Sequence, residues 1–509
     1  MRLKALFPDR DSACRILTAL LTNIRSRCDY ADVRLMGTTA CRTQAVNGSL
    51  QTLQGCRVQA GAYWRALAGG RGAAFYSPCD FTPGDRSSLL ASLEAGGEAV
   101  LSVLRTSPPA ALASAPYRRR AGQVTVWDEG PGEDSPREDG PGLEGQLPAI
   151  CRRAAELSRG AGAGRASGGT LDVETTCIVD DSWMLHADTG GGVAYSRTPW
   201  LHVLHGASAG AAYAGRAAGG RTVEAAFSAA NVRRLRSAEA LAGQLAAAER
   251  LAGRADYDYL LLDHDILGLV VHEAVGHALE GDHVAAGSSA VRAAGQVLWR
   301  SDLPFDIVAS PTLPNCGYHP VDGEGTAGRE VVLVEAGCVK ACLHTLETAA
   351  ELGQQPNGHG FSADWWQPVL SRMTSIHLRP QGVPPELPRG WDETTLADVL
   401  CDRGILRPGG RAIYLTGWDG GHATWSNLSF RANVAAAYVL EPGQKPHLYR
   451  QGLLTGDAAA MLGALVYAFG PVLVDTAGYC WKEGQSVLTS DGGPVITVFR
   501  RTEGVALVG

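Results

Sequence analysis

Two histidines and a glutamate lie close together in the segment V-H-E-A-V-G-H-A-L-E-G-D-H, residues 271–283. The segment resembles the motif H-E-x-x-H, in which two histidines one helical turn apart bind zinc and the glutamate acts as a general base. Here His272 and His277 are five residues apart. On a regular α-helix their side chains would diverge by about 140°, so a metal site requires a local change in the helix.

A π-bulge would supply that change, because one inserted residue returns the two imidazoles to the same face of the helix. Gly276 lies inside the interval, where the missing Cβ makes backbone distortion easier. The preceding run I-L-G-L-V-V, residues 266–271, predicts a buried helix. Two imidazoles and a carboxylate are costly there without partners. We therefore predict a metal site with a π-type widening between His272 and His277.

A catalytic zinc usually has three protein ligands and one open position, so the two imidazoles need a third ligand. Nearby candidates are Glu280, Asp282 and His283, and more distant ones include the twelve cysteines. Among these, Cys338 and Cys342 of C-V-K-A-C lie in a strand-turn-strand context that favours packed thiols. The spacing alone does not choose the third ligand.

The elements that position these residues follow from the hydrophobic periodicity. Helices are predicted over residues 14–27, 87–106, 149–159 and 237–252, and strands over 30–36, 55–63 and 257–262. The metal-site helix is expected to begin at an N-cap formed by Asp265 and to end at Gly281. Beyond residue 303, strands alternate with glycine-rich turns up to the C-terminus.

These patterns predict an α+β protein, with an N-terminal α/β domain followed by a large sheet-dominated C-terminal domain that carries the H-E-x-x-x-H helix. The predicted limits are 1–107 for the N-terminal α+β domain, 108–148 for a Pro/Gly-rich acidic linker or loop, 149–235 for the second part of the N-terminal lobe, and 236–509 for the C-terminal domain. The linker prediction depends on residues 128–144, whose composition is typical of a solvated connector.

Composition narrows the class of protein. Apolar residues make up 45% and charged residues 19% of the 509 positions, which are ordinary values for a soluble globular protein. A net charge of −7 gives no electrostatic footprint for nucleic acid. The longest uncharged run, residues 458–474, contains Gly470 and Pro471 and predicts a core helix followed by a strand rather than a membrane span. We expect a cytoplasmic protein with mostly reduced thiols.

Four motifs, in this order, resemble those of the TldD/PmbA family of metallopeptidases, specifically its catalytic TldD branch. They are H-E-A-V-G-H-A-L-E-G-D at 272–282, D-G-E-G-T-A-G at 322–328, R-M-T-S at 372–375 and G-Y-C-W-K-E-G-Q-S-V at 478–487. The family patterns are H-E-x-x-x-H-x-L-E-G-D, D-D-E-G-T-P-G, R-M-T-N and G-x-C-x-K-E-G-Q-S-V. The resemblance extends over nearly the whole chain.

The resemblance implies a zinc-dependent peptidase with one Zn²⁺ per chain, held by His272, His277 and Cys480. It implies that Glu273 is the general base on a zinc-bound water. The implied substrates are unfolded or flexible peptides, with leader-peptide trimming or peptide maturation as narrower roles. The implied partner is a homologous TldE/PmbA-like subunit without the metal motif, forming a heterodimer, and a homodimer is the alternative.

Two segments depart from the family pattern, at residues 355–366 and 419–426. They contain His359, Trp365, Trp366 and His422, which either line a specialised cleft or pack in the interior. Two other functions therefore stay open. One is a pathway enzyme that acts on a modified amino acid or small peptide in a biosynthetic route, and the other is a non-catalytic scaffold subunit.

Overall fold

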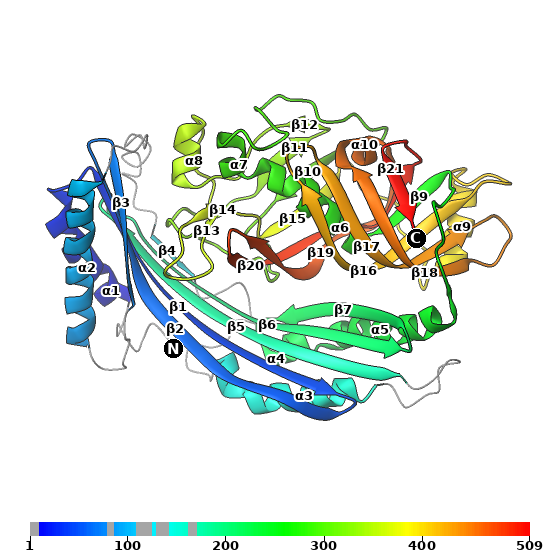
Figure 1. Cartoon of the computed structure of the whole chain (residues 1–509), viewed down its shortest axis with the longest axis horizontal. Coiled ribbons are helices and arrows are strands. Elements are labelled where there is room, and N and C mark those ends of the chain that lie inside the picture. The colour runs from blue at the N-terminus through cyan, green and yellow to red at the C-terminus, as the bar shows by residue number, and fades with distance from the viewer. Residues whose placement is uncertain (1–9, 79–85, 108–124, 129–141, 161–170) are drawn as a thin grey trace.

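The computed structural model describes residues 10–78, 86–107, 125–128, 142–160 and 171–509. Two large sheets organise these residues (Figure 1). The first sheet uses strands from residues 30–220 and the second uses strands from residues 249–508. The change from one sheet to the other therefore falls in the interval that contains the predicted boundary at residue 236.

The N-terminal sheet has seven strands in the order β3-β2-β1-β5-β6-β4, and β7 also pairs with β6. The strands are β1 Tyr30–Val46, β2 Ser49–Ala68, β3 Arg71–Pro78, β4 Thr125–Asp128, β5 Asp172–Asp188, β6 Val193–Ala209 and β7 Ala212–Gly220. Their long antiparallel pairings form a curved layer that runs beneath the C-terminal domain (Figure 1). Of the predicted linker, residues 108–124 and 129–141 lie outside the described residues, whereas 125–128 form β4.

Helices cover the outer face of this sheet (Figure 1). They are α1 Arg10–Arg25, α2 Arg86–Thr106, η3 Leu143–Gln146, α3 Leu147–Ser158, α4 Val223–Ala226 and α5 Ala229–Ala247. Residues Ser87–Thr106 of α2 form the one helix in the described residues that is long and apolar enough to cross a membrane, judged by length and composition only. Of that apolar window 39% is buried inside the protein, and Leu89, Leu93, Val100 and Leu104 pack in the core of the N-terminal domain.

The C-terminal sheet has twelve strands in the order β12-β11-β10-β15-β20-β9-β16-β17-β18-β21, with β19 on β20 and β8 on β18. The strands are β8 Glu249–Arg250, β9 Tyr259–Asp263, β10 Phe305–Ala309, β11 Val331–Glu335, β12 Cys338–Val339, β15 Ser375–Pro380, β16 Ala412–Thr424, β17 Ser429–Leu440, β18 His447–Asp457, β19 Leu465–Lys482, β20 Gln485–Arg500 and β21 Val505–Val508. A separate pair consists of β13 Gly360–Phe361 and β14 Leu370–Ser371.

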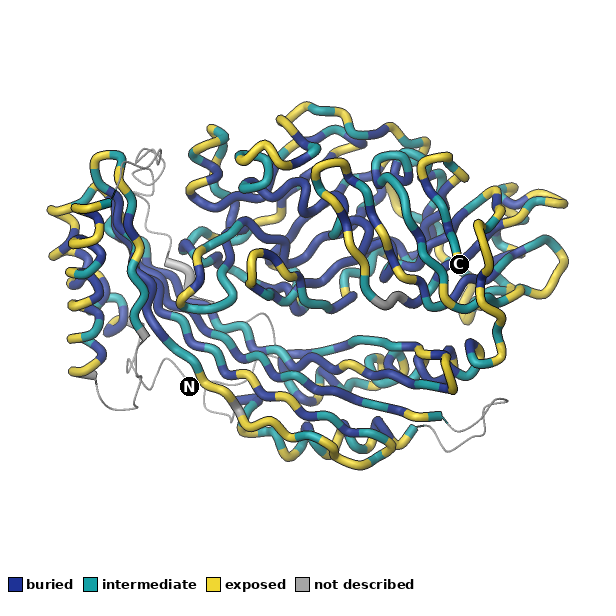
Figure 2. The backbone as a smooth tube through the Cα atoms, viewed as in Figure 1, coloured by how far each residue is buried: buried dark blue, intermediate teal, exposed yellow. Residues whose placement is uncertain are grey.

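The helical segments of this domain are short. They are α6 His264–Val270, η4 Val271–Gly276, η5 His277–Leu279, α7 Gly281–Ala285, α8 Leu346–Glu351, α9 Glu393–Asp402 and α10 Ala458–Gly463. The segment from α6 to η5 belongs to the largest apolar cluster of the protein, and Figure 2 shows the interior strands of the domain as buried backbone. The predicted α+β class and the sheet-dominated C-terminal domain are therefore confirmed.

Candidate metal centre

The helix that carries the histidines begins directly after a buried strand. Asp263, the last residue of β9, is its N-cap and accepts a hydrogen bond from the backbone N–H of Ile266 at 2.9 Å. The prediction that Asp265 forms this cap is wrong. Asp265 instead pairs with Arg234 at 2.8 Å, because the strand continues into the helix without a loop.

The predicted π-type widening is confirmed. Residues Val271–Gly276 form a π-helix, and His277–Leu279 continue it as a 3₁₀ turn. Gly276 lets Met373 pack closely here, since a Cβ at this position would lie 1.8 Å from Sδ of Met373 and the side chain would have to shift. The R-M-T-S segment thus fits closely against the widened turn.

The helix does not end at Gly281, as the sequence predicted. Glu280 has extended backbone angles, and Gly281 is the first residue of the next short helix, α7. A Cβ on Gly281 would come within 2.7 Å of the carbonyl oxygen of Leu343. The glycine therefore permits close contact with a neighbouring segment, whereas the turn itself is made at Glu280.

The structure brings His272, His277 and Cys480 together. Their ligand atoms all lie within 4.8 Å of one another, and all three side chains are buried. The Sγ atom of Cys480, on β19, lies 3.4 Å from Nε2 of His277. Burial raises the pKa of the Cys480 thiol, but the neighbouring His272 and His277 outweigh it and lower that pKa to about 6. Two imidazoles and a thiolate are a donor set that suits zinc with one open position.

Each imidazole is oriented by a carboxylate. Nδ1 of His272 lies 2.8 Å from Oδ1 of Asp491 on β20, and Nδ1 of His277 lies 2.9 Å from Oε2 of Glu280. Such carboxylate–histidine pairs fix the tautomer and ring orientation of metal ligands. Sequence reasoning missed Asp491, which is 219 positions from His272 and is joined to it only by the packing of α6 on β20.

Cations surround the inner carboxylate, Glu280. Nζ of Lys482 lies 2.9 Å from Oε2 of Glu280 and 2.7 Å from Oδ1 of Asp282. Arg372 donates from Nη2 to the Cys480 carbonyl oxygen at 2.6 Å. Burial of Glu280 would raise its pKa, but His277 and then Lys482 hold that pKa well below its usual range. Glu280 is therefore a charged positioning residue.

The other nearby ligand candidates take different places. His277, Glu280 and His283 form a second close group, but the ammonium of Lys482 already pairs with Glu280 there. The ring of His283 stacks on Trp425 at 4.5 Å. Within the described residues, Cys338 and Cys342 belong to neither group.

Comparison with known proteins identifies the domain that contains this centre. Residues 256–494 match the family model of the PmbA/TldA metallopeptidase C-terminal domain. A metalloprotease of Methanothermobacter thermautotrophicus is 29% identical over 248 residues, which are 48% of this chain and 49% of that protein. Residues 256–494 therefore form a domain of the TldD/PmbA metallopeptidase family.

Other members of the TldD/PmbA family agree with this assignment. A zinc metalloprotease TldD homolog of Saccharolobus solfataricus is 28% identical over 246 residues, 47% of this chain and 49% of that protein. The match thus spans about half the length of these curated relatives. The crystal structure of TldE from Thermococcus kodakarensis has the same fold, with a TM-score of 0.66 at 13% identity, over 97% of this chain and all of that one.

Glu273, the base implied by the TldD/PmbA resemblance, lies beside the ligand group. Its side chain is half-buried, and among the described residues it forms no hydrogen bond or ion pair. Its charge helps to raise the pKa of Asp491, after the larger effect of burial, so the two carboxylates are close. Glu273 is thus an unengaged carboxylate at the His272 side of the centre.

The residues that depart from the TldD/PmbA pattern lie away from the ligand group. His359 is fully buried, and burial lowers its pKa to about 4. Trp365 packs against the N-terminal sheet, since a Cβ on Gly61 of β2 would lie 2.1 Å from its ring. Trp366 is 51% exposed, and His422 is exposed on β16. Two of the four residues therefore pack and two face solvent.

Proposed function

We propose that this chain is a zinc-dependent metallopeptidase of the catalytic TldD type, with one Zn²⁺ per chain. The observation that carries the proposal is the buried group of His272, His277 and Cys480, which a π-helix aligns inside a metallopeptidase-family domain. A regular helix would separate the two imidazoles, and the sequence keeps the glycine that lets Met373 pack closely against the widened turn.

The chemistry divides between the metal and the chain. When bound, zinc would lower the pKa of a water molecule and polarise the scissile carbonyl. The Glu273 carboxylate accepts the proton of the attacking water and passes it to the nitrogen of the leaving amine. Asp491 and Glu280 keep the Nε2 atoms of the two imidazoles turned toward Cys480.

Substrate and partner are part of the same proposal. The substrates are unfolded or flexible peptides, and the working form is a cytoplasmic heterodimer with a homologous TldE/PmbA-like subunit. The similarity in fold to TldE supports such a pairing of related chains. The exposed Trp366, where the family pattern is changed, favours a pathway enzyme acting on a small modified peptide as the second candidate.

A carboxylate-to-amide substitution at Glu273 tests the mechanism. Glu273→Gln should retain about one zinc per chain while turnover of a flexible peptide falls by roughly 10²- to 10⁴-fold, the usual contribution of a general base. Glu503→Gln, at an exposed position, is the matched control. Cys480→Ser should lose most of the zinc, because a hydroxyl is a poor substitute for a thiolate. Turnover of Glu273→Gln within a few-fold of wild type would reject Glu273 as the base.

A further inference from the structure

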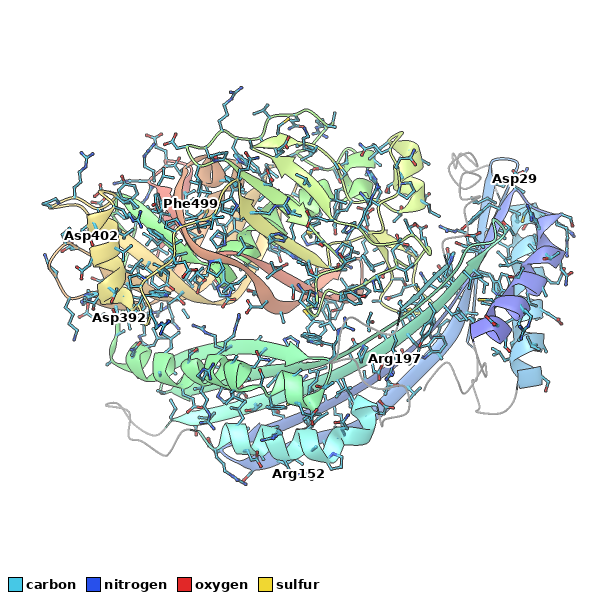
Figure 3. All side chains as sticks on the ribbon, turned by 180° about the vertical axis from the view of Figure 1, so that it is seen from behind. Asp29, Arg152, Arg197, Asp392, Asp402 and Phe499 are labelled. Carbon is cyan, nitrogen blue, oxygen red and sulfur yellow. The ribbon has the colours of Figure 1, made fainter. Side chains whose placement is uncertain are left out.

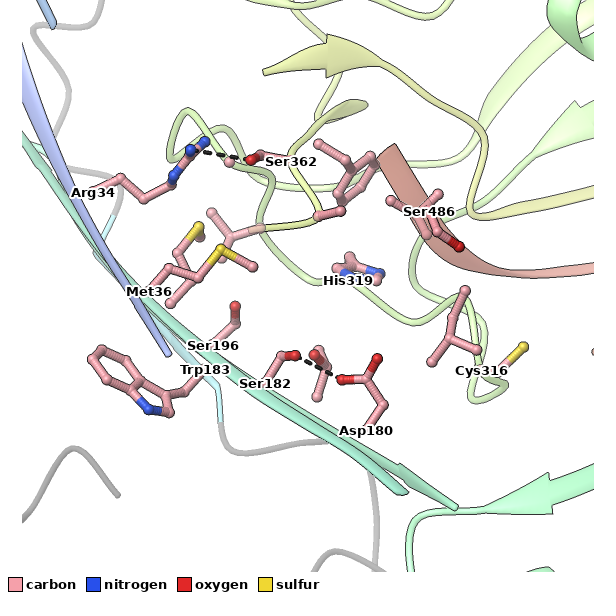
Figure 4. Close-up of a pocket in the computed structure, with 18 residues that line it drawn as sticks. Arg34, Met36, Asp180, Ser182, Trp183, Ser196, Cys316, His319, Ser362 and Ser486 are labelled. Atoms are coloured by element: carbon pink, nitrogen blue, oxygen red, sulfur yellow. Dashed lines mark hydrogen bonds between the residues drawn. The ribbon is translucent and has the colours of Figure 1, made fainter. Parts of the chain in front are cut away.

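A cavity lies between the N-terminal sheet and the β19–β20 hairpin (Figure 4). Its walls include Met36, Asp180 and Met184 from the sheet and Phe361 and Val487 from the C-terminal domain. Phe361 and Val487 also pack against the Cys480 side chain. The cavity therefore shares a wall with the metal centre, close enough to receive a neighbouring part of a substrate.

Asp180 is the acidic group of this cavity. One of its oxygens accepts a hydrogen bond from Oγ of Ser182 at 2.8 Å, drawn as a dashed line in Figure 4. Asp180 forms no ion pair with any residue that the structure describes. The next residue, Asp181, is directed to the other face of the strand and is paired with Arg197 (labelled in Figure 3), whose Nε lies 2.9 Å away. Of these two adjacent carboxylates, only Asp181 is paired with a cation among the described residues.

Among the described residues that line the cavity, the one cationic side chain, Arg34, lies at the far end from Asp180. Arg34 stands opposite His186 in the β1–β5 pairing, whereas Asp180 stands opposite Ala40. Six residues along a strand correspond to about 20 Å. Arg34 is also engaged, since its Nη2 donates to the carbonyl oxygen of Gln367 at 2.8 Å. Its charge is therefore too distant to compensate Asp180.

The remaining titratable groups in the cavity wall, Cys316 and His319, carry no charge near pH 7, and burial raises the pKa of the Cys316 thiol to about 12. His319 is neutral near pH 7, because burial lowers its pKa to about 4. Arg42, further along β1, is exposed and lines the neighbouring cavity. For Asp180 itself, burial raises the pKa, the Ser182 hydrogen bond lowers it, and the charge on Asp181 raises it again. The folded protein thus keeps a carboxylate in a site that disfavours its charge.

We propose that this cavity binds a positively charged group of the substrate and that Asp180 is a specificity-determining residue. The group is either a lysine or arginine side chain or a free N-terminal ammonium. The proposal rests on the proposed peptidase function. The apolar walls formed by Met36, Met184 and Val321 suit the methylene stem of such a side chain, and Asp180 receives the charge.

The test compares peptides that differ at one position. Flexible peptides carrying lysine, or norleucine as its uncharged analogue, are made with a free or an acetylated N-terminus. Wild type should prefer the lysine peptide in kcat/KM by about 10- to 100-fold, mainly through KM, as expected for a charge-assisted hydrogen bond. Asp180→Asn should reduce this ratio to about one. Asp172→Asn, an exposed carboxylate on the same strand, should leave the ratio unchanged.

The comparison of free with acetylated peptides distinguishes the two possible sources of positive charge, the lysine side chain and the N-terminal ammonium. If acetylation of the N-terminus lowers kcat/KM and the replacement of lysine by norleucine does not, the cavity takes the substrate's N-terminal ammonium. If wild type hydrolyses all four peptides and neither norleucine nor acetylation changes kcat/KM, the cation-binding proposal is overturned while the peptidase function stands. If wild type hydrolyses none of them, the peptidase function fails instead.

Binding is measured independently of turnover, with the Glu273→Gln variant. The lysine peptide should bind to it at least about 10-fold more tightly than the norleucine peptide, and Glu273→Gln/Asp180→Asn should lose that difference. Asp180→Asn should melt at or above the wild-type temperature, because it removes a half-buried charge that no cation of the described residues compensates. An Asp180→Asn protein that fails to fold would assign the carboxylate a structural role and overturn the proposal.

Discussion

The two faces of the β19–β20 hairpin handle buried charge differently. On the metal side lie Cys480 and Lys482, and Lys482 pairs with Glu280. On the opposite side Tyr479 contacts the N-terminal sheet, with its ring 5.5 Å from that of His202, and its strand partner Leu488 lines the cavity that contains Asp180. The hairpin thus separates a centre of paired charges from a cavity with an unpaired carboxylate.

This difference suggests which charges serve the fold and which serve a ligand. A buried carboxylate with a bonded cation is costly to disturb, because removing either partner leaves the other unpaired. A half-buried carboxylate without a cation, such as Asp180, lowers stability, and such a group is expected at functional sites. Substitutions that remove one charge at a time should therefore give opposite changes in stability on the two sides.

The largest expected effect is at Glu280, which is fully buried. Glu280→Gln removes the buried carboxylate beside the guanidinium of Arg372 and leaves Lys482 with Asp282 as its one remaining carboxylate among the described residues. We expect the free energy of unfolding of the metal-free protein to fall by about 3–5 kcal/mol, measured by chemical denaturation. Glu503→Gln serves as the control. A loss below about 1 kcal/mol would show that the paired charges do not stabilise this side.

A smaller effect, with a pH signature, is expected at Asp32 in the N-terminal sheet. Burial raises its pKa, but the charge of Arg65 and the hydrogen bond from His186 hold that pKa well below its usual range. A carboxylate with a lowered folded-state pKa stabilises the protein above its ordinary pKa, near 4, and this contribution is lost as the pH falls below that value. Asp32→Asn should cost about 2–3 kcal/mol at pH 7.

Measurements of the free energy of unfolding at decreasing pH test the direction of this pH dependence. The difference between wild type and Asp32→Asn should shrink as the pH falls below about 4. Asp180, whose pKa is raised, should behave in the opposite way, since protonation removes a half-buried charge that has no cation beside it. A pH-independent difference at Asp32 would contradict the ion-pair interpretation.

The sequence predicted what local spacing or a linear motif encodes. The five-residue interval and Gly276 predicted the widened helix, and the G-Y-C-W-K-E-G motif placed Cys480 beside it through the family resemblance. The helices predicted at 14–27, 87–106 and 149–159 and the strands predicted at 30–36, 55–63 and 257–262 overlap observed elements, because their apolar periodicity is clear. The helix limits at Asp265 and Gly281 were wrong, because a direct strand-to-helix junction and a tight segment contact override capping preferences.

Contacts between distant segments left no pattern in the sequence. Asp491 reaches His272 only because α6 packs directly on β20, where a Cβ on Gly268 would meet the backbone of Gly492 at 2.7 Å. Asp180 becomes significant only when the sheet is folded against the hairpin. Its neighbour Asp181 is the same residue type, and only the strand's alternation decides which of the two receives an arginine.

A third prediction concerns the packing that holds the metal side together. Gly276→Ala should lower the free energy of unfolding by about 1–3 kcal/mol through overpacking against Met373. It should also reduce zinc content, since the π-turn would shift. A double-mutant cycle with Met373→Ala measures the coupling, and the cost of Gly276→Ala should fall in that background. Equal costs in both backgrounds would mean that Met373 does not shape the turn.

The smallest effect is expected at Trp481, on the sheet-facing side of the hairpin next to Cys480. Its side chain is 72% exposed, so Trp481→Ala removes little buried surface and should change the free energy of unfolding by no more than about 0.5 kcal/mol. Zinc content should also be retained, because the substitution leaves the opposite, metal-bearing face intact. Trp64→Ala, at a fully buried tryptophan, is the contrasting control, with a cost of about 3–5 kcal/mol.

A loss above about 1 kcal/mol at Trp481 would mean that the hairpin tip is packed rather than open. The side of the hairpin that faces the cavity would then be closed to a peptide.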